Sequence, residues 1–377
     1  MIKKIILFIV IVFCIVIMGQ VRVSADEVIS DIIDDTGISS LDDDLNDNAD
    51  EFFSENGISA DNPESILNIR IEDIFSEITD EIKENIFLPL KLFTSLTAVV
   101  MVSSLSGSLG NTIKNGSSAK AFNMVCILAA ISVISEPVVK CFYNCTENIR
   151  AGAVFMTGFI PVFSGITVAG GNISSAMSYS TLIFAAAQLA IHLSDSVIVP
   201  VLSMCMALSI VDSINPAISL SALINGFNKF TTRLLGFIMM IFTGLISIQS
   251  IIGTSADNLT ARAGKYIVSN FVPVVGSAVS DAYSTLRGSM GLLKGGAGSF
   301  GIIALLVMIL PSLVYSGLYY MSVRFAFIVA DIFGEKQLSK LFSDISSILS
   351  VIFSVTVCFA VLMVISTGIV MLVGMSV

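Results

Sequence analysis

Long apolar runs separated by short polar loops make up most of the chain from residue 87 onward. A helix needs about 20 apolar residues to cross the hydrocarbon core of a membrane, and eight runs approach or exceed that length. They lie near residues 87–105, 121–140, 152–169, 173–193, 196–213, 234–253, 299–320 and 346–373. Gly-, Ser- and Asn-rich loops separate them. The pattern predicts an all-α fold, with a polytopic helical membrane domain over residues 87–377.

The stretch 254–298 leaves the number of spans open, because it mixes apolar residues with Arg262, Lys265 and Arg287. If residues 264–280 cross the membrane completely, the chain has nine spans. If they enter and return on the same side, it has eight. The internal repeat described next favours nine.

Residues 150–162 and 262–274 repeat one another at an offset of 112 residues. Six of the thirteen positions are identical: Arg150/Arg262, Ala151/Ala263, Gly152/Gly264, Phe159/Phe271, Pro161/Pro273 and Val162/Val274. The same offset carries the first two spans roughly onto the fifth and sixth. We therefore predict a parallel internal repeat, with units near 87–198 and 199–320 and a final span at 346–373.

The first 25 residues have the pattern of a secretory signal peptide. Lys3 and Lys4 precede fourteen uninterrupted apolar residues, and Val23-Ser24-Ala25 supplies small residues for cleavage before Asp26. The apolar run is shorter than a typical span, which favours a cleaved signal peptide; the alternative is an uncleaved anchor. Either reading exports the segment that follows.

Residues 26–86 are strongly acidic, with 20 of the 29 Asp and Glu residues of the chain and only Arg70 and Lys83 as basic residues. This charge excludes nucleic acid as a partner of the segment. Residues 26–61 have few large apolar side chains, so we expect disorder. Residues 62–86 place isoleucines near helical spacing between acids, which predicts an amphipathic helix leading to the first span.

Composition and motifs argue against a soluble protein and against an enzyme. Only 13% of the residues are charged, compared with about 25% in soluble domains, while 55% are hydrophobic. There is no P-loop, His192 is the only histidine, and the six cysteines are scattered. We therefore expect no catalytic residue, no cofactor and no metal site.

The two prolines of the repeat are the strongest candidates for a functional feature. Each removes a backbone donor and weakens a helix at a corresponding place, a pattern that can mark a substrate path near the bilayer midplane. The alternative is that these prolines only shape helix packing. The candidate conduit or hinge residues are Pro161, Pro273, Phe159, Phe271, Asn270, Gly152 and Gly264.

Charged residues lie mainly near the ends of the predicted spans. Arg150 and Arg262 are predicted to anchor span ends at the headgroups. Asp195, Asp212 and Asp257 are expected close enough to an interface to be hydrated. No carboxylate stands out at mid-span, where a proton-coupled transporter would usually bury one.

Three stretches carry a specific resemblance to a known family. They are TGFIPVFSG at 157–165 with the glycine pair at 170–171, GLISIQSIIGTSADNLTARAGKYIVSNFVPVVG at 244–276, and DAYSTLRGSMGLLKGGAGSFG at 281–301. Through them the sequence resembles the stage III sporulation protein AE family of endospore-forming bacteria. The resemblance covers about residues 90–377 and does not extend to the acidic segment.

The resemblance implies a membrane-embedded, permease-like component of the channel or secretion complex between mother cell and forespore. It implies a multi-pass protein of the mother-cell-derived outer forespore membrane, with the acidic segment on the extracytoplasmic side. Its implied partners are other membrane proteins of the stage III sporulation complex and the lipid bilayer. Two alternatives remain open: an autonomous secondary transporter of a small solute, and a membrane scaffold that transports nothing.

Overall fold

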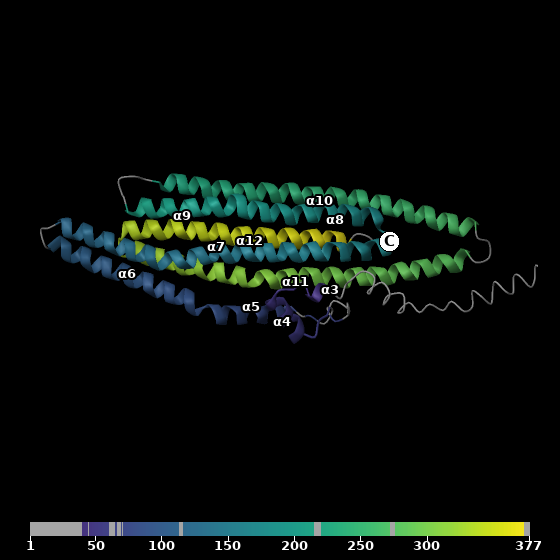
Figure 1. Cartoon of the computed structure of the whole chain (residues 1–377), viewed down its shortest axis with the longest axis horizontal. Coiled ribbons are helices and arrows are strands. Elements are labelled where there is room, and N and C mark those ends of the chain that lie inside the picture. Colours follow the sequence, from purple (N-terminus) through teal and green to yellow (C-terminus); the bar gives the residue numbers. More distant parts are fainter. Residues whose placement is uncertain are drawn as a thin grey trace, which may run out of the picture.

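The computed structural model describes residues 40–43, 45–59, 65, 69, 71–112, 116–214, 220–271 and 276–372. Over these residues the protein consists of helices and short connections, without strands, which confirms the predicted all-α class (Figure 1). The predicted signal peptide at 1–25 and residues 26–39 lie outside the described residues. The predicted internal repeat is not confirmed, since Pro273 and its neighbours also lie outside them.

Most of the protein is a bundle of long antiparallel helices with three short helices at its N-terminal side (Figure 1). The short helices are α3 (Ser40–Asp43), α4 (Asp47–Glu55) and α5 (Ile71–Asn85). The bundle contains α6 (Phe87–Thr112), α7 (Gly116–Ala169), α8 (Ile173–Leu193), the π-helix η2 (Ser194–Ile198), α9 (Val199–Ile214), α10 (Ser221–Phe271), α11 (Gly276–Ile332) and α12 (Lys336–Leu372).

Six described helical segments are long and apolar enough to cross a membrane, whereas the sequence predicted eight or nine spans. They are Phe87–Ser106, Ala121–Ala169, Ile173–Ile214, Ser221–Ala263, Gly288–Ile332 and Lys336–Ile369. The predicted loop between 140 and 152 is helical within α7, and the same helix continues through Pro137 and Pro161. Likewise, η2 joins α8 directly to α9. The predicted span count is therefore not confirmed.

Part of the predicted disordered segment is also folded. Asn46 caps α4, its side-chain oxygen accepting from the backbone N–H of Ala49 at 3.1 Å. Phe52 and Phe53 are buried. The two aromatic side chains explain why this acidic stretch differs from the expectation, because they supply apolar area that dense charge alone would lack.

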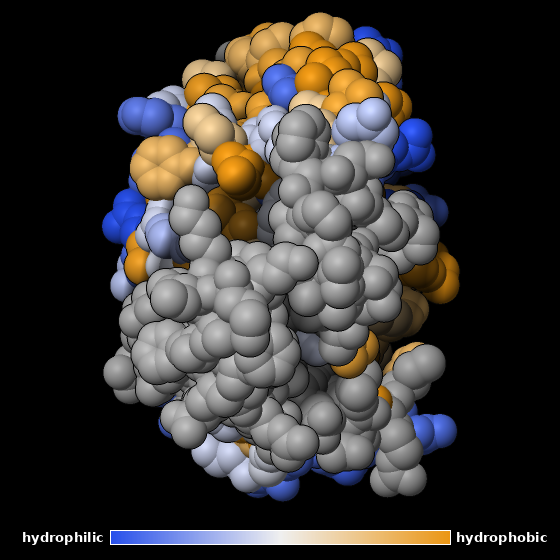
Figure 2. Space-filling model, turned by 90° about the vertical axis from the view of Figure 1, so that its right-hand side faces the viewer, coloured by the Kyte–Doolittle hydropathy of each residue, from blue (hydrophilic) through white to orange (hydrophobic). Residues whose placement is uncertain are grey.

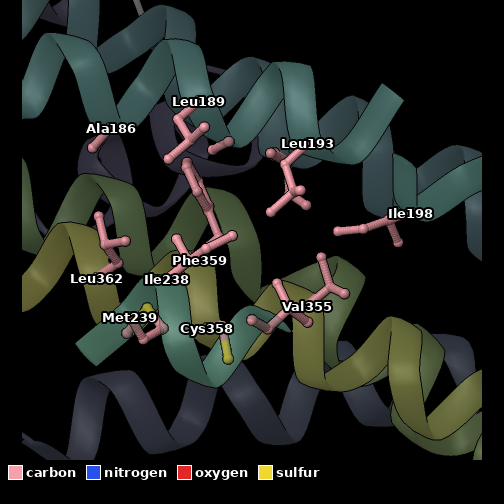
Figure 3. A pocket seen from close by; sticks show the side chains of 13 residues that line it. Ala186, Leu189, Leu193, Ile198, Ile238, Met239, Val355, Cys358, Phe359 and Leu362 are labelled. Carbon is pink, nitrogen blue, oxygen red and sulfur yellow. The ribbon is translucent and has the colours of Figure 1, made fainter. Parts of the chain in front are cut away.

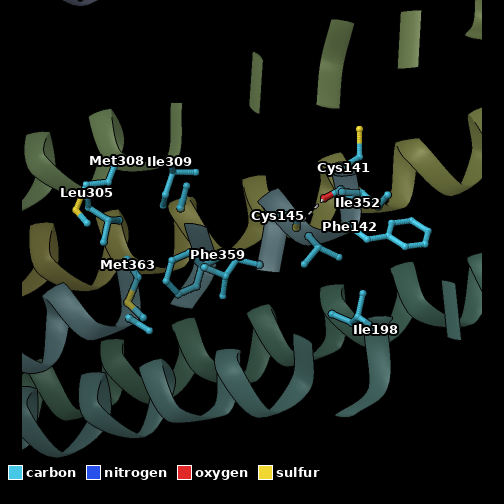
Figure 4. Packing of buried hydrophobic residues seen from close by; sticks show 14 of the residues in the cluster. Cys141, Phe142, Cys145, Ile198, Leu305, Met308, Ile309, Ile352, Phe359 and Met363 are labelled. Atoms are coloured by element: carbon cyan, nitrogen blue, oxygen red, sulfur yellow. Dashed lines mark hydrogen bonds between the residues drawn. The ribbon is translucent and has the colours of Figure 1, made fainter. Parts of the chain in front are cut away.

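Helices α11 and α12 form the centre of the bundle, and α6 and α10 lie at its edges. The apolar windows of α11 and α12 are 56% and 50% buried, compared with 28% for α6 and 17% for α10. Figure 4 shows α7 packed on this centre near Cys145. The Cys145 thiol lies 3.0 Å from the Thr356 hydroxyl of α12. The core is therefore packed by side chains from several helices along the length of the bundle.

The two ends of the bundle are made by different connections. At the α8 end, a turn with Gly171 in the left-handed region (φ 81°) joins α7 to α8. At the α12 end, a turn with Gly334 (φ 73°) joins α11 to α12, and α9 connects to α10 (Figure 1). We call the end of the bundle at which α8 begins the α8 end, and the opposite end, at which α12 begins, the α12 end.

Candidate functional site

The three stretches that carry the family resemblance meet toward the α8 end, in a region that we call the motif junction. It combines residues of α7, α8, α10 and α11, and it lies next to α4 of the acidic segment. Its members are Phe159, Phe163, Ser175, Gly253, Asp257, Lys294, Gly298, Phe300 and Gly301.

Two glycines of α11 allow α7 to approach closely. A Cβ atom on Gly301 would lie 2.4 Å from Cζ of Phe159, and one on Gly298 would lie 3.2 Å from the Phe163 ring. Both rings are fully buried, and their centroids are 5.4 Å apart. Small residues at helix contacts permit such close packing in membrane proteins. Gly298 and Gly301 therefore leave the space in which the two phenylalanine rings pack against α11.

The carboxylate of Asp257 holds the start of α8 against α10. It accepts hydrogen bonds from the backbone N–H groups of Ser174 at 2.8 Å and Ser175 at 3.0 Å. These donors belong to the first turn of α8, which has no partners within its own helix. One turn earlier on α10, a Cβ atom on Gly253 would lie 3.0 Å from Cα of Ser175. Gly253 and Asp257 thus provide close approach and capping from one face of α10.

Lys294 of α11 completes this arrangement with a positive charge. Lys294 and Asp257 are each only 3% exposed, and the two charges attract one another. The positive end of the α8 dipole lies on the same carboxylate. A buried charge is stable only with such compensation. The cluster therefore links α8, α10 and α11 through buried polar and charged groups, and separating these groups would cost free energy.

The acidic segment packs on the same part of α11. The Phe53 ring of α4 stacks on Phe300, with centroids 4.9 Å apart and an interplanar angle of 25°. Phe300 lies between the two glycines that seat α7. The segment predicted to be exported is thus in direct contact with the motif junction.

The first copy of the repeat has a clear place in the bundle. Gly152 faces α12, where an added Cβ atom would lie 3.0 Å from the Phe359 ring. Phe159 is buried in the motif junction, whereas Pro161 is exposed on the outer side of α7. Arg150 is half exposed and forms an ion pair with Asp195 at 2.8 Å.

The second copy is described only in part. Arg262 is exposed on α10. Gly264, Asn270 and Phe271 have helical backbones near the end of α10, and nothing is described of their side chains. Pro273 lies outside the described residues. The structure therefore does not show the candidate conduit residues gathered in one place, and their conduit role stays a prediction.

A small apolar cavity lies beside Phe359, between α7, α8, α10 and α12 (Figure 3). Its volume is about 50 Å³, and its lining includes Leu193, Ile198, Leu235 and Cys358. A buried water needs several polar partners, which this lining does not offer. The cavity therefore provides no place for a hydrated solute.

Buried carboxylates are the main feature that the sequence interpretation missed. Asp212 and Asp257 were expected near a hydrated interface, but they are 2% and 3% exposed. Asp212 is satisfied by Lys340 at 2.7 Å, the Leu220 N–H at 2.8 Å and the Ser221 hydroxyl at 2.9 Å. The burial of Asp344, which is 4% exposed, was not predicted from the sequence. The four-residue spacing of Gly253 and Asp257 was the available signal, because it places both on one helix face.

The described residues contain no group of three or more His, Cys, Asp or Glu side chains that could hold a metal ion. The chemistry of the motif junction is instead that of packing, capping and charge compensation.

Comparison with known proteins identifies relatives of the chain. The family described as Stage III sporulation protein AE has a model that matches residues 59–374. Stage III sporulation protein AE of Bacillus subtilis (strain 168) is 25% identical over 237 residues, which cover 63% of this chain and 58% of that protein. The match thus spans less than two thirds of the relative's length. No solved structure matches the chain. The family match includes the whole bundle and begins after α4.

Proposed function

Because this chain belongs to the stage III sporulation protein AE family, which is not a known enzyme family, we propose that it is the membrane-embedded core of a sporulation complex. In this proposal the complex links mother cell and forespore, and the chain resides in the mother-cell-derived outer forespore membrane. The acidic segment faces the intermembrane space, and other membrane proteins of the complex bind the bundle.

The observation that supports this proposal most directly is the motif junction. The stretches that resemble the family meet at the place where α4 packs on α11. Among the described residues, the motif junction contains neither a set of catalytic groups nor a cavity large enough for a solute. A tightly packed helix contact, with a capped helix and two buried opposite charges, suits a platform that holds partners in a fixed geometry.

Helix α10 offers a second surface for such partners. It is the least buried of the six long segments. In the end-on view of Figure 2, apolar side chains gather on the side of the molecule where α10 lies. The large exposed apolar residues of α10 are Leu223, Phe230, Phe237, Met240, Ile241, Leu245, Ile248, Ile251, Ile252, Leu259 and Tyr266. This surface must face lipid or neighbouring proteins.

The proposal can be tested in sporulating cells that carry the chain as their sole copy. Gly301→Leu should displace Phe159 and reduce both the copurification of membrane partners and a late forespore reporter. Gly291→Leu is the matched control, because a Cβ atom there meets nothing within 4 Å. Normal reporter activity and partner recovery with Gly301→Leu would contradict the proposal. Solute uptake by liposomes that contain only the purified chain would instead support an autonomous transporter.

The prolines of the repeat give a separate prediction about the conduit. If the interrupted segment has a special role, Pro273→Ala should lower the sporulation frequency more than Pro63→Ala. Both prolines lie outside the described residues, so this prediction depends on the sequence repeat alone. Equal sporulation frequencies for the two variants would count against a special role of Pro273. A scaffold predicts loss of partner copurification, without loss of solute flux, when Pro161 and Pro273 are both replaced by alanine.

A further inference from the structure

A polar groove of about 510 Å³ lies between α10, α11 and α12, away from the motif junction. Three basic side chains line it: Lys229 and Arg233 from α10 and Arg324 from α11. The hydroxyl groups of Ser346, Ser347 and Ser350 line it from α12. None of the residues that line this groove is acidic. Such a groove has the charge and the donors to bind an anion.

Among the described residues, the basic side chains of this groove have no acidic partner. Within the part of the chain that the structure describes, Lys229, Arg233 and Arg324 form no ion pair. Arg324 instead lies over the Phe327 ring, 4.6 Å from its centroid. This contact holds the guanidinium group in place without neutralising its charge. The positive charge of the groove is therefore available to a ligand.

Asn228 gives an independent sign of a missing partner. Its side chain lines the groove and is only 6% exposed. Neither its amide oxygen nor its amide nitrogen has a hydrogen-bond partner among the described residues. Buried polar side chains nearly always have at least one hydrogen-bond partner. A bound polar group in the groove would satisfy this amide.

The polar groove continues into an apolar one. The second groove, of about 630 Å³, shares Tyr320 and Ser350 with the first. It is lined by Leu313, Val314 and Gly317 of α11 and by Phe353 of α12, and Ile78 and Ile82 of α5 border it. Gly317 faces the Phe353 ring across this groove, and an added Cβ atom would lie 3.5 Å from that ring, in ordinary van der Waals contact.

The order of residues along the helices gives the combined site a direction. On α11 the chain passes from Gly317 to Arg324 toward the α12 end, and on the antiparallel α12 Ser346 precedes Phe353. The charged part therefore lies nearer the α12 end, and the apolar part extends toward the α8 end. A ligand that fits has an anionic head and a hydrocarbon tail.

We propose that this site binds an anionic phospholipid, with its phosphate between Lys229, Arg233 and Arg324 and an acyl chain along Gly317 and Phe353. Free phosphate is also an anion, but it would leave the apolar groove unused. The amide of Asn228 and the hydroxyl of Ser350 would donate to the phosphate oxygens, whereas the hydroxyls of Ser346 and Ser347 already donate to the Ser343 carbonyl. This inference is independent of the proposed function, because it concerns a site that the sporulation complex is not needed to form.

The test uses the full chain, purified in detergent and depleted of lipid. Binding is measured by native mass spectrometry and by the rise in unfolding temperature on adding phosphatidylglycerol, phosphatidylcholine or inorganic phosphate. We expect phosphatidylglycerol to bind best, and Arg233→Gln/Arg324→Gln to weaken its binding roughly tenfold or more. Lys336→Gln, an exposed lysine at the start of α12, is the control and should leave binding unchanged.

A second variant separates lipid from free phosphate. Gly317→Leu should fill the apolar groove and weaken phosphatidylglycerol, while any binding of inorganic phosphate stays unchanged. The double arginine variant covers the case in which Gly317→Leu does not fold. Equal binding of phosphatidylcholine and phosphatidylglycerol would overturn the proposal. So would unchanged binding in the arginine variant, or a full temperature shift with inorganic phosphate alone.

Discussion

At Gly301, the absence of a single methyl group decides how closely α7 can approach α11. The Phe159 ring occupies the space where a Cβ atom would be, and that ring has no exposed surface into which it could withdraw. At Asp257, one carboxylate fixes the first turn of α8 and also faces Lys294. Individual residues of the motif junction therefore control contacts between whole helices.

We expect Gly301→Ala to lower the free energy of unfolding by about 1–3 kcal/mol, because the extra methyl group overpacks a filled core. Gly291→Ala on the same helix should raise it by about 0.5–1 kcal/mol, because alanine favours helix and nothing is displaced. Unfolding of the purified chain in a denaturing-detergent titration measures both. Equal stabilities of the two variants would show that Phe159 can move at no cost.

Asp257→Asn should destabilise the protein by about 1–3 kcal/mol, because an amide keeps one acceptor and leaves Lys294 buried without its counter-charge. Adding Lys294→Met should recover part of this loss, so that the two changes are not additive. Asp331→Asn, at an exposed position of α11, is the control and should stay within about 0.5 kcal/mol of the parent. Simple additivity in the double variant would exclude the Asp257–Lys294 coupling.

The sequence identified some of these residues but not their roles. Gly152 and Phe159 were chosen because they repeat at 264 and 271, and both are buried at helix contacts. Asp257 was predicted to be hydrated near an interface and the burial of Lys294 was not predicted, since hydropathy treats a charged residue in an apolar run as the edge of a span. Whether such a residue is hydrated or compensated depends on which helix packs on it, and that partner lies 82 or 83 residues away in the case of Asp257.

Among the elements, α4 and α5 are the ones whose contacts should respond to pH. Burial raises the pKa of Glu77 above its ordinary value, and the nearby charges of Glu55, Asp80, Glu51 and Glu84 raise it further. Burial also raises the pKa of Glu81, with contributions from Glu84 and Glu77. The packed segment therefore binds protons more tightly than the free segment does.

Packing of α4 and α5 on α11 should strengthen as the pH falls. A carboxyl with a raised pKa favours the packed state below its ordinary pKa of 4.5, and this contribution is lost as the pH rises through the packed-state value. The protection factors of the amides of residues 71–85, which correct for the intrinsic pH dependence of exchange, should thus rise as the pH falls from neutral toward 4.5. Glu77→Gln/Glu81→Gln should slow exchange already at pH 7 and flatten the dependence. The exposed Glu72→Gln serves as control, and an unaltered pH profile in the double variant would refute this cause.

Helix type was predictable from the sequence, but helix length was not. Apolar runs identified every long helix, because all contain windows of high hydropathy. Hydropathy divided α7 at 140–152, where the polar residues Asn144, Glu147 and Arg150 interrupt the apolar pattern. Those side chains reach the exposed surface or pair with Asp195, so the backbone remains helical beneath them. Side-chain polarity and backbone continuity are separate properties in such a helix.

For the whole molecule, the six long segments and the proposed export of the N-terminal segment together predict a definite topology. The α8 end should lie on the side of the acidic segment, and the α12 end on the cytoplasmic side. When the chain is produced in the plasma membrane of vegetative cells, Ser289→Cys should then react with a membrane-impermeant thiol reagent added from outside, and Asp331→Cys only after the cells are opened. The native cysteines described by the structure give little background, since four are buried and Cys358 is partly buried. Labelling of Ser289→Cys only from the cytoplasm would support nine spans instead.

The length of the uninterrupted helices also limits how a single copy of the protein can be placed in a membrane. The segment of α7 that could cross a membrane contains 49 residues, with the polar Asn144, Glu147 and Arg150 near its middle. At about 1.5 Å per residue it is roughly 73 Å long, more than twice the hydrocarbon thickness of about 30 Å. In a single copy that stands upright in one bilayer, apolar side chains along a large part of the helix length would be exposed to water. Neighbouring proteins, a steep tilt of the helices or a second bilayer must cover that surface. The length of α7 therefore indicates that the protein does not stand alone in a single bilayer.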